Sequence, residues 1–458
     1  MAEFHPETEV REDDLLETRR VTAVLAAVET GDTARLTDLL EPLHAADIAD
    51  LLEQIGASDR RELLRLWSGE IDGEILSEID DSIREEVIES LSPEVLSQAV
   101  RELDTDDVVD ILEDLDAPQQ GLILDALEDI DRVAVEQAMA FPEHSAGRLM
   151  QREVVVAPEH WSVGEAIDHL RRIDRLPDQF YHVILVDPRM KPQGYVTLGR
   201  LLSSRRDVKL RGIVEDSFRT VNATEDEADV AYIFNQYHLI SVPVVDSSDR
   251  LVGVITIDDA MNVLDEEHEE DILRLAGVGE SSISDRVVET TRQRLPWLFV
   301  NLMTAILASM VIAQFEATIA RLVALAVLMP IVASMGGNAG TQSLTVAVRA
   351  LATRDLTGSN VWRVIRRETV VGLVNGVFFA LVMGMVSWVW FGDRMLGLVI
   401  GAAMVVNLLV AGMAGILVPV LMDKAGVDPA LASGTFVTTV TDVVGFFAFL
   451  GLATVVLL

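Results

Sequence analysis

The most constraining feature of this chain is a stretch of Pro, Gly and amide residues inside apolar sequence. It runs Leu328-Met-Pro-Ile-Val-Ala-Ser-Met-Gly-Gly-Asn-Ala-Gly-Thr-Gln342. The surrounding apolar segment is long enough to cross a bilayer, which needs about 20 residues. In hydrocarbon, an interrupted helix ladder and buried amides persist only where other protein or water satisfies them. We therefore expect this helix to line a water-filled path.

The last apolar segment, 430–458, has one ionisable side chain near its middle, Asp442. Helical spacing places small and polar residues on one face of each of the two segments. These residues are Ser334, Asn338 and Thr341 on the first, and Gly434, Thr438, Thr441, Asp442 and Gly445 on the second. Two helices with such faces, one of them carrying a carboxylate, indicate a cation path.

Helix packing is the alternative interpretation, because Gly-rich faces also bring membrane helices together. For the 336–340 stretch alone, packing and conduction are equal alternatives. Asp442 favours conduction, because an unpaired Asp at mid-membrane costs about 2.5–3.5 kcal/mol on insertion scales. No Lys or Arg lies inside an apolar span to neutralise it. We predict that Asp442 contacts the cation, with Gly337, Asn338, Thr341, Thr438 and Thr441 lining the path.

Charge separates the chain into two parts. The formal net charge is −38, and almost all charged residues precede residue 295. Such acidity argues against nucleic acid and anionic lipid surfaces and favours cations as partners. Host adaptation is an alternative source of the acidity, because only three of the 36 basic residues are Lys.

The amino terminus lacks a signal-peptide pattern, so the acidic part is expected in the cytoplasm. Cysteine is absent, which excludes disulfides and thiolate metal sites.

An internal repeat organises the region from about 21 to 141. Leu43-His-Ala-Ala-Asp-Ile-Ala-Asp-Leu-Leu-Glu53 aligns without gaps with Leu103-Asp-Thr-Asp-Asp-Val-Val-Asp-Ile-Leu-Glu113. Apolar residues at spacings of three and four predict short helices, each of which buries its apolar face against a neighbouring helix. The repeat therefore predicts a helical superhelix of undetermined hand.

A second repeat begins near Arg152. His182-Val-Ile-Leu-Val-Asp187 with Gly194-Tyr-Val-Thr-Leu198 matches Ser241-Val-Pro-Val-Val-Asp246 with Gly253-Val-Ile-Thr-Ile257. This strand, turn and strand pattern between helices resembles the paired cystathionine-β-synthase-type (CBS) module. Such modules are regulatory and sometimes bind adenine nucleotides, so ATP is a candidate ligand that no single residue supports. The region has no Gly-rich phosphate loop and no nucleophile with a base, so we expect no enzyme activity.

A run of eight carboxylates follows within residues 258–271, with no Lys or Arg among them. On a helix, Glu266, Glu267, Glu270 and Asp271 lie within about a turn, where like charges are mildly destabilising. A hydrated divalent cation such as Mg²⁺, which prefers oxygen ligands, would relieve this repulsion. From the residues alone, a solvated acidic surface is the simpler interpretation.

Five apolar spans are expected at 295–315, 322–348, 370–391, 396–422 and 430–458. Three Arg residues precede the first span and five occupy the second connection, whereas the first and third connections have one each. The positive-inside rule then places the amino terminus in the cytoplasm and the carboxyl terminus outside. We predict a multi-pass protein of the cell membrane, in contact with lipid.

The two polar stretches resemble the pore signature of the MgtE family of magnesium channels. The resemblance rests on Pro330 with Met335-Gly-Gly-Asn-Ala-Gly-Thr-Gln342, and on Thr438-Thr-Val-Thr-Asp-Val-Val-Gly445. It extends over nearly the whole chain and implies a multidomain α plus α/β fold. The expected parts are a tail (1–20), a helical superhelix (21–150), a tandem CBS pair (151–265), an acidic segment with a connecting helix (266–294) and a five-helix transmembrane domain (295–458).

The resemblance also implies that cytosolic Mg²⁺ is sensed between the amino-terminal and CBS domains. The expected sensor ligands are acidic: Asp106, Asp107, Asp110, Asp258, Asp259, Glu266, Glu267, Glu270 and Asp271. Residues 272–294 would form the helix that relays the signal to the pore.

The function that these features favour is a homodimeric Mg²⁺ channel closed by cytosolic Mg²⁺. One Asp per chain holds a divalent ion poorly, but a two-fold axis would bring two Asp442 side chains together around a hydrated ion. One alternative is a transporter that exchanges Mg²⁺ or a transition metal for Na⁺ or H⁺, because interrupted spans also occur there. Another is a membrane-anchored nucleotide sensor, which leaves Asp442 unexplained.

Overall fold

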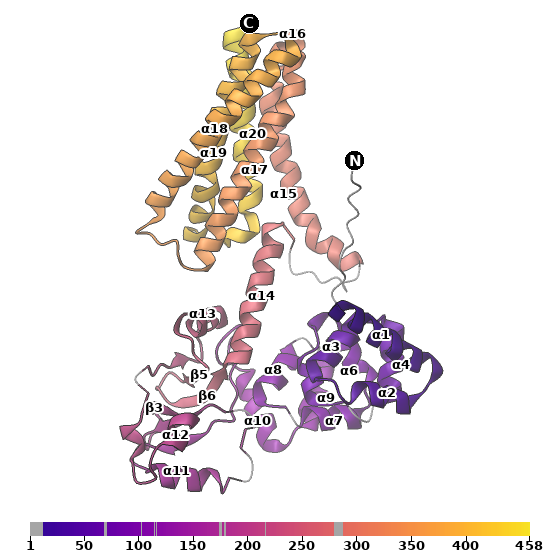
Figure 1. The fold of residues 1–458 in the computed structure, drawn as a ribbon, viewed down its shortest axis with the longest axis vertical. Coiled ribbons are helices and arrows are strands. Elements are labelled where there is room, and N and C mark those ends of the chain that lie inside the picture. Colours follow the sequence, from indigo (N-terminus) through magenta and orange to yellow (C-terminus); the bar gives the residue numbers. More distant parts are fainter. Residues whose placement is uncertain are drawn as a thin grey trace. The chain divides into compact units, whose positions relative to one another are not determined.

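The computed structural model describes residues 12–67, 71–101, 103–113, 115, 117–173, 176–177, 180–215, 217–278 and 287–458. Contacts divide the chain into two compact units, Met1–Glu266 and Glu267–Leu458. Figure 1 shows helices throughout, with two small sheets in the first unit. Of the expected tail, residues 1–11 lie outside the described residues, and 12–20 already belong to helix α1 (Glu12–Thr30).

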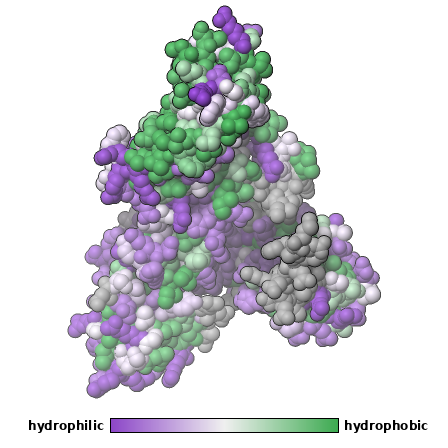
Figure 2. All heavy atoms as spheres, turned by 45° about the horizontal axis from the view of Figure 1, so that its top comes forward, coloured by the Kyte–Doolittle hydropathy of each residue, from purple (hydrophilic) through white to green (hydrophobic). Residues whose placement is uncertain are grey.

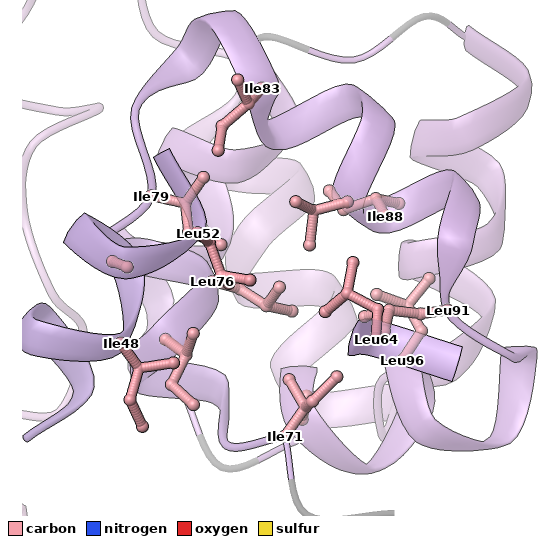
Figure 3. Close-up of a cluster of buried hydrophobic side chains, with 14 of the residues drawn as sticks. Ile48, Leu52, Leu64, Ile71, Leu76, Ile79, Ile83, Ile88, Leu91 and Leu96 are labelled. Atoms are coloured by element: carbon pink, nitrogen blue, oxygen red, sulfur yellow. The ribbon is translucent and has the colours of Figure 1, made fainter. Parts of the chain in front are cut away.

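The first unit begins with short helices that pack around one apolar core. They are α1, α2 (Thr33–Leu40), α3 (Ala45–Gln54), α4 (Ala57–Trp67), α5 (Gly73–Ser77), α6 (Asp81–Ser90), α7 (Pro93–Val100), α8 (Thr105–Glu113), α9 (Ala117–Ala126) and α10 (Asp129–Ala138). Leu64, Leu91 and Leu96 meet in this core (Figure 3), and each is less than a tenth exposed. The predicted all-helical region is confirmed.

The internal repeat is visible in the hydrogen bonds. Helices α3 and α8 begin sixty residues apart, as do α4 and α9. The buried Arg60 donates to the carbonyl oxygens of Leu52 and Ile55 at 2.8 and 3.1 Å. Gln120, at the same place in the second copy, donates to Leu112 and Leu115 at 2.8 and 3.1 Å. Each side chain satisfies carbonyls at or just past the end of the preceding helix, which otherwise lack partners.

The predicted tandem repeat forms two similar three-stranded sheets. The first contains β1 (Val156–Pro158), β2 (His182–Val186) and β3 (Pro192–Thr197), with α11 (Val163–Leu170) and α12 (Leu198–Ser203); the second contains β4 (Val221–Asn222), β5 (Ser241–Val245) and β6 (Leu251–Thr256), with α13 (Glu227–Tyr237). In each sheet, the first pair of strands is parallel and the second pair is antiparallel. The register of the antiparallel pair shifts at equivalent positions, Leu185/Val186 in the first sheet and Val244/Val245 in the second. The paired strand–turn–strand prediction is confirmed.

The connecting segment differs from its prediction. Helix α14 (Ile257–Leu275) continues directly from β6 and carries the run of carboxylates. It ends before Gly277, whose φ of +72° is a left-handed conformation that Gly adopts without strain. Residues 279–286 lie outside the described residues, and the next helix begins at Val287. The expected single helix over 272–294 is therefore wrong, because the chain turns at Gly277.

The second unit consists mainly of long apolar helices. They are α15 (Val287–Ala313), α17 (Ala324–Ala352), α18 (Val361–Phe391), α19 (Arg394–Lys424) and α20 (Pro429–Leu457), with the short α16 (Glu316–Arg321) between the first two. Among the described residues, five helices are long and apolar enough to cross a membrane, as predicted. Figure 2 shows hydrophobic residues over much of the surface of this unit.

Helix α19 is the most buried of the spans and packs against α17, α18 and α20. Glycines permit its close approach to α18: a Cβ on Gly372 would lie 2.4 Å from the Leu408 carbonyl oxygen, and one on Gly397 would lie 2.6 Å from that of Gly384. Small residues at helix crossings are the usual means of tight packing in membranes. This packing determines where α17 and α20, the two helices with polar faces, are placed.

Candidate functional sites

Helix α17 presents its predicted polar residues on one exposed face. Ser334, Asn338 and Thr341 are all exposed, whereas Gly336 and Gly340 are buried on the opposite face. The Asn338 amide nitrogen lies 3.5 Å from the Ser334 hydroxyl, at the limit of a hydrogen bond. The amide therefore has hydrogen-bonding capacity left for water or an ion.

Helix α20 lies directly beside α17 and carries the carboxylate. A Cβ on Gly340 would lie 2.6 Å from the Val437 Cγ1 atom, and one on Gly337 would lie 4.0 Å from Thr438 Cγ2. Thr438 is exposed, Asp442 is half-buried and Thr441 is fully buried. The residues predicted to line the path therefore lie on two adjacent helices. Thr441 is the exception to the predicted exposure, because it is buried inside the helix bundle.

The threonine hydroxyls on these helices donate to their own backbones. Thr341 donates to Gly337, Thr438 to Gly434 and Thr441 to Thr438, each at 2.9 Å. Each hydroxyl oxygen keeps lone pairs that can accept a hydrogen bond or face a cation. In the described part of the chain, no cationic side chain lies beside Asp442. This part of α17 and α20 therefore offers hydroxyl oxygens and a carboxylate that no described Lys or Arg neutralises.

A second group of acidic residues lies in the first unit, where α8 meets the start of α14. Asp106 is 7% exposed, and its nearest acidic neighbours include Asp259, Asp107 and Asp104. The Asp259 carboxylate accepts from the Thr256 hydroxyl at 2.6 Å. Asp106, Asp107, Asp258 and Asp259 were predicted as sensor ligands, and the fold brings them together.

Burial and mutual repulsion change the acidity of this cluster. Burial, followed by repulsion from Asp259, raises the pKa of Asp107 to about 7. Burial also raises the pKa of Asp259 to about 7, against the opposing effect of the Thr256 hydroxyl. For Asp106 the same two causes, burial and Asp259, raise the pKa well above its ordinary range. Asp107 and Asp259 therefore exchange protons near neutral pH.

The cluster suits a hydrated cation better than a bare one. Among the described residues, no three acidic or imidazole side chains converge closely enough to hold a metal ion directly. Asp110, a further predicted ligand, is 3.0 Å from the guanidinium of the buried Arg84. Mg²⁺ commonly keeps several waters and contacts one or two carboxylates. Any cation held here would therefore contact at most two of the described side chains directly.

The remaining predicted sensor residues lie further along α14. Glu266 and Glu267 are exposed, and Glu270 and Asp271 are partly buried in the second unit. Arg274 bridges two acids there: its guanidinium lies 2.7 Å from Glu270 and 3.0 Å from Asp428, whose side chain caps α20. Burial, then repulsion from Asp428, raises the pKa of Asp271. Arg274 therefore neutralises part of the charge of this group.

Five polar residues with a place in these sites were not predicted from the sequence. They are Asp104, Arg274, Glu368, Asn407 and Asp428. Glu368, on α18, accepts from the Ser343 hydroxyl of α17 at 3.2 Å. Asn407 is fully buried on α19. A single amide in the otherwise apolar span 396–422 was a usable signal, as was the spacing of four residues between Glu270 and Arg274. Asp428 and Glu368, by contrast, pair with residues of other helices.

An open cleft is lined by residues of both CBS repeats. Its lining includes Glu153, Tyr181, His182 and Thr256, and no Lys or Arg occurs among its described lining residues. The binding of ATP at this pair of repeats stays a prediction. The walls of the cleft connect to the acidic cluster, because Glu153 accepts from the Thr105 hydroxyl at the start of α8 at 2.7 Å.

Family models match three regions of the chain. Residues 329–452 match a model described as a divalent cation transporter, and residues 43–144 match one described as the MgtE intracellular N domain. Residues 146–207 and 210–266 each match the CBS domain. The matched regions correspond to the apolar helices α17–α20, the helical region and the two sheets.

Curated proteins match over most of their length. A magnesium transporter MgtE of Thermus thermophilus is 32% identical over 452 residues, which is 96% of this chain and 99% of that protein. One of Enterococcus faecalis is 34% identical over 319 residues, 70% of each. A crystal structure of the cytosolic domain of the Mg²⁺ channel MgtE in complex with ATP aligns with 28% identity and a TM-score of 0.49, covering 53% of this chain and 99% of that one.

Proposed function

The chain belongs to the MgtE family of magnesium transporters, and we propose that it is a Mg²⁺ channel closed by Mg²⁺ bound to its acidic clusters. The observation that carries the channel is Asp442, a half-buried carboxylate in a membrane span with no cationic neighbour among the described residues. Asn338 and the Thr438 hydroxyl supply uncharged oxygen atoms nearby. Together they would hold an ion through its water shell, which avoids the cost of dehydrating Mg²⁺.

A symmetric dimer completes the ion path. One carboxylate balances half of a divalent charge, and a two-fold axis beside α17 and α20 would supply the second. The exposed polar face of α17 supports this proposal, because amide and hydroxyl groups are unfavourable against lipid tails. A second copy that covers Ser334, Asn338 and Thr341 would remove that cost. The remaining apolar surface would contact lipid.

Helix α14 connects sensing to conduction in this proposal. Its first turn carries Asp258 and Asp259 of the acidic cluster. Its last residue, Leu275, packs against Leu344 of α17 and Ala430 of α20. Mg²⁺ bound at the cluster would therefore bias the position of α14, whose end contacts α17 and α20, the two helices proposed to line the ion path. Such coupling requires only that the ion binds one conformation more tightly than the other.

Ion flux measurements distinguish this channel from a coupled exchanger. In proteoliposomes with a Mg²⁺ gradient and no other permeant cation, we expect a current that reverses at the Mg²⁺ equilibrium potential. Changing the Na⁺ or H⁺ gradient should leave that potential unchanged. A reversal potential that follows either gradient would establish coupled transport. The absence of any Mg²⁺ flux would favour an anchored nucleotide sensor.

We propose that the amino terminus is cytoplasmic and the carboxyl terminus external. Because the chain has no Cys, single thiols report position without background. We expect Leu458→Cys to react with an impermeant maleimide on intact cells, and the exposed Ser359→Cys to react only after permeabilisation. The reason is the concentration of Arg around the second connection. The reverse labelling pattern would invert the orientation and remove the acidic clusters from cytosolic Mg²⁺.

A further inference from the structure

Asn407 lies in the middle of α19 and is fully buried. Its Nδ2 atom donates to the Val332 carbonyl oxygen of α17 at 2.8 Å. Its Oδ1 atom has no hydrogen-bond partner in the described part of the chain. A buried amide is unfavourable in an apolar span unless its hydrogen bonds repay the loss of water. A side chain retained at such a position requires an explanation beyond filling space, which Leu or Met would do more favourably.

The glycines around Asn407 show what its side chain separates. A Cβ on Gly336 of α17 would lie 2.2 Å from Nδ2, and a Cβ on Gly445 of α20 would lie 2.7 Å from the same atom. Real side chains do not approach so closely, so a side chain at either position would displace the Asn407 amide. The amide of α19 therefore occupies the space between α17 and α20.

The two glycines adjoin the residues of the ion path. Gly336 is two residues from Asn338, and Gly445 is three residues from Asp442. We propose that Asn407 is a positioning residue that fixes the distance and axial register of α17 against α20. The proposal rests on the proposed function in one respect, namely that Asn338 and Asp442 line the path. Apolar packing alone lets membrane helices slide along one another, whereas a hydrogen bond to one backbone carbonyl selects a single register.

Disulfide formation between the two helices tests this inference without relying on transport. The nearest atom to a Cβ on Gly337 is Thr438 Cγ2, at 4.0 Å, so a cysteine pair at 337 and 438 lies within disulfide reach. In the double variant Gly337→Cys, Thr438→Cys, mild oxidation should form an intramolecular disulfide, read as loss of maleimide-PEG labelling. Adding Asn407→Ala should slow its formation by up to about tenfold, the factor that a strong membrane hydrogen bond provides.

Ser387→Ala is the matched control. Ser387 is also fully buried and its hydroxyl also lacks a partner among the described residues, but it lies on α18. We expect this change to leave the rate of disulfide formation unaltered. If Asn407→Ala does not reach the membrane, Asn407→Leu, which keeps the branched shape and removes the donor, takes its place. Oxidation as fast as in the parent double variant, or an equal effect of Ser387→Ala, would overturn the inference.

Transport measured on the same Asn407 variants, without the cysteines, separates the two proposals. If Asn407 positions the path, Asn407→Ala should raise the Mg²⁺ concentration for half-maximal uptake at an unchanged amount of membrane protein, and Ser387→Ala should not. Slower disulfide formation with unchanged uptake would support the positioning role and overturn the ion path through Asn338 and Asp442. Unchanged disulfide formation would overturn the positioning role, whatever the uptake.

Discussion

Asp442→Asn is expected to abolish Mg²⁺ uptake while the protein still inserts and assembles. Asparagine keeps the size of the side chain and removes its charge, so the packing of α20 beside α17 should persist. In the proposed dimer the substitution removes both carboxylates at once, and nothing else in the described spans replaces them at that position. Asp442→Glu keeps the charge on a longer side chain and should impair uptake less.

Uptake in a magnesium-requiring strain, normalised to membrane protein, measures this effect. Asp423→Asn is the matched control, because it removes one carboxylate at the exposed end of α19, outside the ion path. We expect the control to grow and transport like the parent chain. Parental uptake by Asp442→Asn would exclude this carboxylate from conduction and leave the packing interpretation of the two polar faces.

The fold was largely predictable because its signals are local or periodic. Five apolar spans, the sixty-residue repeat and the paired strand motifs are each patterns within a continuous stretch. The faces of α17 and α20 also followed from helical spacing, and the structure places them on adjacent helices. These agreements arise because residue period and span length determine helix faces directly.

The parts of the structure that could not be predicted from the sequence depend mostly on contacts between distant segments. Arg274 lies just after the acidic run, and its partner Asp428 is 154 residues away, so no local pattern indicated that the two would pair. The continuous helix expected over 272–294 is wrong because α14 ends at Leu275, just before Gly277 with its positive φ. Asn407 is a single amide in an apolar span, and only the glycines on two other helices show what it contacts.

Stability of the first unit without divalent cations is expected to fall as pH rises. An acid whose pKa is higher in the folded than in the unfolded chain binds more protons when folded, so its contribution is lost as pH rises between the two values. For Asp107 and Asp259 the folded pKa is about 7, and unfolded Asp titrates near about 3.9. The loss should therefore accumulate from about pH 4 and be complete somewhat above pH 7.

Mg²⁺ should reverse this loss, because a cation replaces the protons that the cluster otherwise keeps. Binding that displaces protons tightens as pH rises, by up to about tenfold per pH unit for each proton released. Limited proteolysis of the purified full-length protein, titrated with Mg²⁺ at constant ionic strength, measures the effect. We expect millimolar Mg²⁺ to protect strongly at pH 8 and weakly at pH 5.5. Na⁺ at matched ionic strength should protect at neither pH.

The double variant Asp107→Asn, Asp259→Asn should lose both responses together. Without these carboxylates the protein should resist proteolysis at pH 8 even in the absence of Mg²⁺. Any further protection should need at least about tenfold more Mg²⁺, because two anionic ligands are gone. Glu29→Gln, Asp38→Asn removes the same charge from the exposed surface of α1 and α2 and should behave like the parent chain. Equal protection by Na⁺, or an unshifted titration in the cluster variant, would reduce the acidic cluster to a screened surface and remove the proposed sensor.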